Sequence, residues 1–231
     1  MGNDKNLLNE LRIYMISIGM FLVIMTFFVN MTGHSAIGFT GLWYELDLRI
    51  EGSMATWLEM LLILLCAIPS YLVYREKDTP TIIRAFYLLM VFAILFLAAD
   101  EMLSIHEYIG QKFSEATGVG AGTFLEGFSW VLLYAPAMAV GLLMFLFSTR
   151  KLFLTADSKS KRRFILDLII IFLSVCGVLL LEIFEAYIFS QNSKPLILPS
   201  FEESLEILVI LGFYDFTYTL FNMYSSRNVD E

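Results

Sequence analysis

Apolar residues gather in six long blocks along the chain, and shorter polar segments separate them. Each block is dominated by Leu, Ile, Phe, Met and Val and holds about twenty residues, enough for a helix to cross roughly 30 Å of hydrocarbon. The pattern therefore predicts an all-α fold, a polytopic membrane bundle of six transmembrane helices in a single domain over residues 1–231. The six predicted spans cover residues 11–32, 54–75, 82–108, 124–149, 164–189 and 201–224.

The composition strengthens this prediction and excludes other classes of protein. Hydrophobic residues make up 58% of the chain and charged residues 16%, and the mean hydropathy is +0.72, far from the averages of soluble domains. Two cysteines exclude a disulfide-stapled secreted module, and a net charge of −8 argues against a nucleic-acid partner. The first apolar block is too long for the apolar region of a signal peptide, so we expect that it is not cleaved from the protein. The expected partner is the lipid bilayer, and self-association stays open.

Charged residues divide unevenly between the two predicted sides of the membrane. Twelve of the 15 basic residues fall on the side that holds both chain ends, and Arg49, Lys112 and Lys194 fall on the other side. Basic residues favour the cytoplasmic side, so we expect cytoplasmic N and C termini in a multi-pass protein of the plasma (inner) membrane. Fourteen of the 23 acidic residues fall on the outer side. An acidic outer face would concentrate cations there.

Some of these outer acids have a structural interpretation that competes with a functional one. Three acids have the capping-box spacing, in which a carboxylate bonds a backbone N–H at the start of a helix, and capping weighs equally with ligand binding for them. They occur in Thr56-x-x-Glu59, Thr123-x-x-Glu126 and Ser200-x-x-Glu203. Four further acids lie in predicted loops, and we expect them to be solvated: Glu45, Asp47, Glu51 and Glu115.

Other acids lie at the outer C-terminal ends of the third and fifth spans, where the helix dipole disfavours negative charge. Three outer basic residues are too few to neutralise them, which leaves protonation or a bound cation. At 100° per residue, acids on the third, fifth and sixth spans can converge on one point. The predicted metal ligands are Asp100, Glu107, Glu182, Glu185, Glu202 and Glu206.

Two further residues near this cluster are candidate catalytic groups. Glu101 or His106 would carry protons to and from a metal-bound water. His106 reaches the cluster only if the helix unwinds near Ile105, because a regular helix turns its side chain away from Asp100. The oxygen-rich ligands suit Ca²⁺, Mg²⁺ or Mn²⁺, and carboxylates with a histidine could also hold zinc or iron. The predicted cofactor is therefore a divalent metal ion of unspecified identity.

The strings DEMLSIHE, residues 100–107, and EESLE, residues 202–206, resemble motifs of uncharacterised bacterial multi-span proteins with a DE-x4-HE motif and a downstream EES-x-E. The resemblance covers about a tenth of the chain and implies that these acids and His106 belong to one site. The architecture is also similar to that of ceramidase-like membrane hydrolases, which hold a zinc among helix ends. Those enzymes use several histidines, whereas this chain has two, so no residue role is transferred.

Three functions are compatible with these features. The first is a metal-dependent hydrolase whose metal-activated water attacks a lipid-borne or membrane-proximal ester or amide. The second is a divalent-cation transporter or channel, although Asp215 is one of few polar residues in the inner halves of the spans. The third is a membrane sensor or assembly subunit with a structural ion site. For Asp215 itself, we expect a structural ion pair with Arg84 or Arg163 rather than an ion relay.

Overall fold

The computed structural model describes residues 2–32, 44–50, 52–76, 79–119, 129–190 and 197–227. All regular secondary structure within these ranges is helical. The elements in chain order are α1 (Gly2–Thr32), α3 (Met54–Leu65), α4 (Ala67–Arg75), α5 (Thr81–Leu103), α6 (Ile105–Thr117), α7 (Ser129–Thr155), α8 (Ser158–Ser190) and α9 (Leu198–Arg227). The sequence prediction of an all-α fold is confirmed.

Five helical segments of the described chain are long and apolar enough to cross a membrane. They are Asp4–Met31, Met54–Arg75, Thr81–Leu103, Ser158–Leu181 and Leu198–Ser225. The fourth predicted span, 124–149, begins among residues 120–128, outside the described residues, and continues in α7, where Ala139–Arg150 is a shorter apolar stretch. Many large apolar side chains on these helices face outward, including Phe172, Leu173 and Phe147, as expected where lipid is the solvent.

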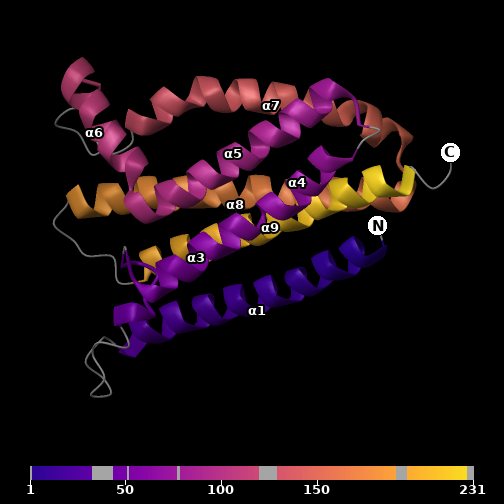
Figure 1. Ribbon diagram of the computed structural model, residues 1–231. Helices are drawn as coiled ribbons and strands as arrows, with labels where there is room; N and C mark the ends of the chain where they lie inside the picture. Colours follow the sequence, from indigo (N-terminus) through magenta and orange to yellow (C-terminus); the bar gives the residue numbers. More distant parts are fainter. Residues whose placement is uncertain are drawn as a thin grey trace.

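The long helices run along a common axis, so that the bundle has two ends (Figure 1). The first turn of α1 and the last turn of α9 lie at the same end, which we call the terminal end. The opposite end holds the starts of α3 and α9 and the end of α5. We call it the acidic end because it carries Glu59, Glu101, Glu203 and Glu206.

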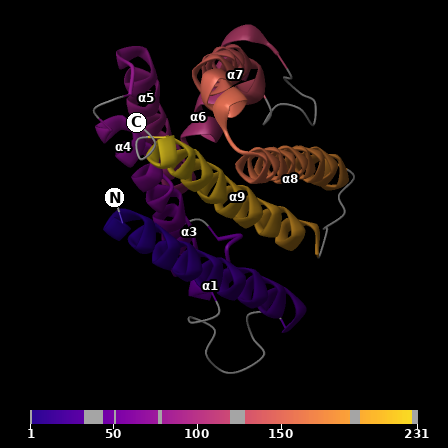
Figure 2. The same cartoon turned by 90° about the vertical axis from the view of Figure 1, so that its right-hand side faces the viewer.

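Helix α9 is the central element of the bundle. It packs against α8 on one side and against α1 on the other, and it also contacts α3 and α4 (Figure 2). Small residues permit the close approach of these helices. A Cβ atom on Gly177 of α8 would lie 2.7 Å from Leu205 Cδ1, and one on Gly19 of α1 would lie 2.9 Å from Ile207 Cγ2. The packing of α9 therefore fixes the positions of its carboxylates relative to neighbouring helices.

Two helix boundaries depart from a regular span. The span Met54–Arg75 divides at Cys66 into α3 and α4, one turn before Pro69, whose ring removes the N–H that would bond the Leu65 carbonyl. The third predicted span, 82–108, is wrong in its last residues, because α5 ends at Leu103 and Ser104 takes the left-handed conformation with φ 45° and ψ 43°. The chain then starts α6 in a new direction.

Candidate functional site

Three glutamates gather at the acidic end and form what we call the glutamate triad: Glu59, Glu203 and Glu206. One carboxylate oxygen of each lies within 4.8 Å of the others. Glu59 projects from the second turn of α3, and the other two lie one turn apart in the first turns of α9. Since both helices begin at the acidic end, their packing brings the three side chains together.

Glu59 is the most enclosed member of the triad. Its side chain is 1% exposed, and neither carboxylate oxygen has a hydrogen-bond partner among the described residues. Glu101, at the end of α5, lies close enough to interact electrostatically with both Glu59 and Glu203. A buried carboxylate without a donor is costly, and like charges around it increase the cost. Either protonation or a bound cation must therefore compensate the negative charge of Glu59.

The capping interpretation is wrong for both triad acids to which it applied. The N-cap of α3 is Ser53, whose Oγ accepts a hydrogen bond from the Thr56 backbone N–H, so Glu59 lies too far along the helix to close a capping box. Helix α9 begins at Leu198, which places Ser200 inside the helix and leaves Glu203 without that role. The third capping candidate, Glu126, lies outside the described residues.

The two basic side chains described at this end form ion pairs with acids outside the triad, and Arg49 also interacts electrostatically with Glu203. Arg49 forms a two-pronged ion pair with Asp47, with distances of 2.7 Å from Nε and 2.6 Å from Nη2, and donates a hydrogen bond to the Asn30 side chain. Asp47 is 1% exposed, so the prediction that it is solvated is wrong. Lys112 of α6 pairs with Glu115 at 2.7 Å, in a helix rather than a loop. The third outer basic residue, Lys194, lies outside the described residues.

A second constellation joins Asp100 and His106 across the break at Ser104. Asp100 Oδ1 accepts the backbone N–H of His106 at 2.7 Å, and Asp100 Oδ2 lies 3.0 Å from His106 Nδ1. The rings of His106 and of Trp130 in α7 pack in a T-shaped arrangement, with centroids 5.1 Å apart. The helix does unwind beside Ile105, as the approach of His106 to Asp100 required, and the two residues form a pair that we call the Asp–His pair.

The predicted ligands therefore divide between several places. Glu206 belongs to the triad, and Asp100 bonds His106. Glu202 lies in α9 beside Glu203, with which it interacts electrostatically. The side chains of Glu107 in α6 and of Glu182 and Glu185 in α8 lie outside the described residues. The sequence left Glu59 and Glu203 equally divided between capping and ligand binding, and neither was among the predicted ligands. The i, i+3 spacing of Glu203 and Glu206 on one helix face was the signal that favoured ligand binding.

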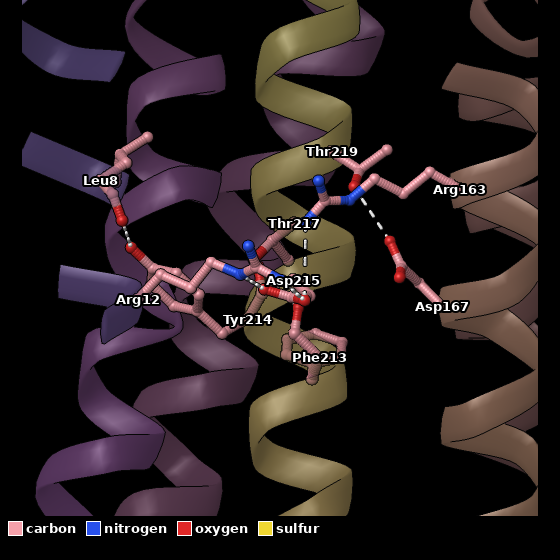
Figure 3. A network of polar contacts seen from close by, with 9 residues as sticks. All are labelled: Leu8, Arg12, Arg163, Asp167, Phe213, Tyr214, Asp215, Thr217 and Thr219. Atoms are coloured by element: carbon pink, nitrogen blue, oxygen red, sulfur yellow. Dashed lines mark hydrogen bonds and ion pairs between the residues drawn. The ribbon is translucent and has the colours of Figure 1, made fainter. Parts of the chain in front are cut away.

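Apart from the glutamate triad, a second group of charged side chains forms a network of polar contacts (Figure 3). Arg12 of α1 forms a bidentate ion pair with Asp215 of α9, with distances of 2.5 and 2.7 Å. Arg163 of α8 approaches the same carboxylate at 3.6 Å. Asp167, also in α8, accepts a hydrogen bond from Thr219 at 2.9 Å. The network thus links α1, α8 and α9 through charges.

The predicted ion pair of Asp215 is present, with one correction to the partners. Arg163 does contact it, but Arg12 is the bidentate partner. Arg84 instead donates a hydrogen bond to the Tyr74 carbonyl and lies over the Tyr74 ring. Arg12 and Asp215 meet because α1 and α9 pack side by side in opposite directions.

Comparison with known protein families assigns the chain to one family. The model described as "Domain of unknown function (DUF8692)" matches residues 15–218, and the chain belongs to that family. The match includes the glutamate triad, the Asp–His pair and Asp215. Among curated proteins and among solved structures, no match is found.

Proposed function

We propose that this protein is a six-span membrane protein with a divalent-cation site at the glutamate triad. Five spans follow from the helices already described, and α7 supplies the sixth, because its 27 residues extend about 40 Å as a helix. The basic residues assign the terminal end to the cytoplasm of a cell with a plasma (inner) membrane. The triad then faces outward, in the half of the bundle that collects cations.

The observation that carries the cation site is the environment of Glu59. Its two oxygens are buried without a hydrogen-bond donor among the described residues, and one of them lies within 4.8 Å of a carboxylate oxygen of Glu203 and of Glu206. A cation would satisfy these oxygens and balance the clustered charge in one step, whereas protonation supplies one proton donor per acid. The triad rather than the Asp–His pair is the expected site, because one Asp100 oxygen already accepts the His106 backbone N–H and the other lies 3.0 Å from His106 Nδ1.

The ligand atoms favour a hard cation. The triad offers carboxylate oxygens alone, which suit Mg²⁺, Mn²⁺ or Ca²⁺, whereas zinc prefers sites that include nitrogen or sulfur. Three carboxylates do not fill the six or more positions that these ions take. The remaining positions would hold water or a substrate oxygen, supported by Glu101 as a neighbouring acid.

This incomplete ligand shell supports metal-dependent hydrolysis as the activity. A cation with open positions activates a bound water for attack on an ester or amide, here of a lipid or membrane-proximal substrate. Glu101, next to Glu59 and Glu203, would accept the proton of that water. His106 would serve as a second proton carrier, with Asp100 fixing its ring through Nδ1.

Transport of the cation is less well supported. A conducting path needs binding groups near the membrane midplane, and Asp215 was the carboxylate best placed to provide one. Its oxygens are held by Arg12 at 2.5 and 2.7 Å and approached by Arg163. A cation passing this point would have to compete with two arginines.

Elemental analysis of the detergent-purified protein tests the cation site. We expect near-stoichiometric Mg, Mn or Ca per wild-type chain, and loss of that metal in Glu59→Gln. Glu115→Gln is the matched control, because Glu115 lies at the same end but is exposed and pairs with Lys112. It should retain the metal. Equal metal content in wild type and Glu59→Gln would contradict the proposal.

Hydrolysis is tested separately from metal binding. Purified protein is incubated with mixed-micelle phospholipid and N-acyl lipid substrates, and release of fatty acid is followed with and without the metal. We expect turnover that requires the metal and falls strongly in Glu101→Gln while metal content is kept. A metal-replete protein whose unfolding temperature depends on the metal but which releases no product would support a structural ion in a sensor or assembly subunit instead.

A further inference from the structure

Two hydroxyl groups, one on α1 and one on α9, are buried without a hydrogen-bond partner among the described residues. They are Thr26 Oγ1 and Ser200 Oγ, and both residues are 0% exposed. Most buried hydroxyls in proteins bond either to protein or to ordered water. Two such hydroxyls on neighbouring helices therefore indicate a group that bonds them from outside the chain.

The packing of α1 against α9 places these two hydroxyls opposite each other. The helices run in opposite directions (Figure 2), and Gly19 contacts Ile207, since a Cβ on Gly19 would lie 2.9 Å from Ile207 Cγ2. Seven residues make about two helical turns, so Thr26 and Ser200 each lie on that same contact face, two turns toward the acidic end. The aromatic rings of the two residues that follow them in sequence have centroids 5.1 Å apart, in agreement with this level.

The same spacing places the glutamate triad at this level. Helices α3 and α9 both begin at the acidic end, and Cys66 Sγ of α3 donates a hydrogen bond to the Ile210 carbonyl of α9 at 3.5 Å. Seven residues earlier on each helix lie Glu59 and Glu203. Glu203 follows Ser200 by three residues, about 4.5 Å along the helix axis. The two hydroxyls and the triad therefore lie at one level of three packed helices.

Four buried polar atoms at this level share the lack of a described partner: Thr26 Oγ1, Ser200 Oγ and both carboxylate oxygens of Glu59. The hydroxyls do not bond the carboxylate directly, so a ligand that satisfies all four must reach both kinds of group. A cation binds the carboxylate oxygens. Water bound to that cation donates hydrogen bonds, and a hydroxyl oxygen accepts them.

We propose that the triad binds its cation in a partly hydrated form, and that Thr26 and Ser200 hold the water ligands of that ion. This inference rests on the proposed cation site and extends it, because it adds α1 to the site and names the class of ion. Mg²⁺ gives up its waters reluctantly and usually keeps several of them, whereas Ca²⁺ takes six to eight oxygen ligands in a flexible geometry. Hydroxyls placed to bind water therefore select Mg²⁺ over Ca²⁺.

The position of the hydroxyls also distinguishes two sides of the site. On the side of α1, Thr26, Ser200 and Glu59 are at most 1% exposed, so the waters that they hold are enclosed. Glu101 of α5 and Glu206 of α9 are only half-buried, and α5 lies on the other side of α3 from α1 (Figure 2). A substrate oxygen would therefore reach the ion from the side of Glu101.

Isothermal titration calorimetry of the detergent-purified whole protein, with Mg²⁺ and separately with Ca²⁺, tests the proposal. Thr26→Val keeps the shape of the side chain and removes its hydroxyl, and Ser200→Ala removes the hydroxyl on α9. We expect each variant to bind Mg²⁺ about tenfold more weakly, the effect of one lost hydrogen bond, with a smaller change for Ca²⁺. Thr26→Ser keeps the hydroxyl and should bind Mg²⁺ as wild type does.

Ser70→Ala is the matched control. Ser70 is also 0% exposed and its hydroxyl likewise has no partner in the described part of the chain, but it lies in α4, beyond α3 toward the terminal end. This variant should bind both ions as wild type does, and circular dichroism checks that every variant is folded.

The possible results separate this inference from the cation site on which it rests. Unchanged Mg²⁺ affinity in both Thr26→Val and Ser200→Ala, or an equal weakening in Ser70→Ala, would overturn the role of the two hydroxyls and leave the triad as a cation site. A wild-type protein that binds neither ion would overturn the cation site and this inference together.

Discussion

Arg12 and Asp215 are separated by 203 positions in the chain and joined by a bidentate ion pair inside the bundle. The pair connects the first helix to the last, at a depth where each charge alone would be costly. With side chains 31% and 23% exposed, neither residue is fully enclosed, and the bidentate geometry rather than burial distinguishes this pair.

Asp215→Asn should lower the free energy of unfolding by about 2 kcal/mol, because it removes the charge-assisted hydrogen bonds that satisfy Arg12. SDS titration in mixed micelles measures this change. The double variant Arg12→Met/Asp215→Leu should recover most of the loss, since an apolar pair of similar volume often replaces an ion pair without cost. A double variant as unstable as Asp215→Asn would show that the ion pair is not the cause.

Gly19→Ala should destabilise the contact between α1 and α9 by about 1–3 kcal/mol through overpacking. The new methyl group would lie 2.9 Å from Ile207 Cγ2 and 3.2 Å from Leu211 Cδ1, and a β-branched side chain such as Ile207 has little room to turn. Gly141→Ala in α7 is the matched control, because its Cβ meets nothing within 4 Å. It should be neutral or gain about 1 kcal/mol from helix propensity. The same SDS titration compares them, and equal effects would refute the packing argument.

Ser104→Gly should stabilise the protein by about 1 kcal/mol, because glycine adopts the left-handed conformation of residue 104 without the penalty of a Cβ atom. Ser104→Ala keeps the Cβ and should give no such gain. The Ser104 side chain makes no capping hydrogen bond, so its hydroxyl does not offset the comparison. If alanine stabilised as much as glycine, the backbone strain at this break would be excluded as the cause.

The start of α8 should loosen as the pH falls. Asp157 accepts hydrogen bonds from the Ser160 hydroxyl and from the backbone N–H groups of Ser160 and Lys159, and these hold the pKa of its carboxyl below the ordinary value of 3.8. A lowered native pKa means that the cap stabilises the helix above the unfolded pKa. That contribution disappears as pH falls through the native value.

Hydrogen exchange at the amides of Lys159 and Ser160, measured from pH 6 to 3 and corrected for intrinsic exchange, checks this expectation. Protection should decrease in wild type as Asp157 becomes protonated. In Asp157→Asn the side chain still caps the helix but no longer titrates, so protection should not depend on pH. Protection that does not depend on pH in the wild type would contradict the prediction.

Sequence pattern was sufficient for the helical class and for the five spans because long apolar runs are dictated by the solvent that surrounds them. It also located the acidic end of the bundle. Local motifs were less informative about Glu59 and Glu203. Both acids have the capping-box spacing in the sequence, but the helices do not begin at Thr56 and Ser200 as that motif requires. Ser53 is the N-cap of α3, and α9 begins at Leu198.

Long-range contacts were the main limit of prediction from one sequence. Nothing in the sequence near Asp215 singles out Arg12, since their contact depends on how α1 and α9 pack. The approach of His106 to Asp100 likewise depends on the left-handed Ser104, a residue type that seldom takes this conformation. A serine is a weaker sequence signal than a glycine for a helix that ends in the left-handed conformation.

The central claim is that the glutamate triad binds a divalent cation, and an anomalous difference map of protein crystals soaked in Mn²⁺ tests it most directly. We predict one peak among the carboxylates of Glu59, Glu203 and Glu206, about 2.0–2.6 Å from oxygen atoms of each, and its disappearance in Glu59→Gln crystals. A map without a peak at the triad, or with its strongest peak at the Asp–His pair, would contradict the claim.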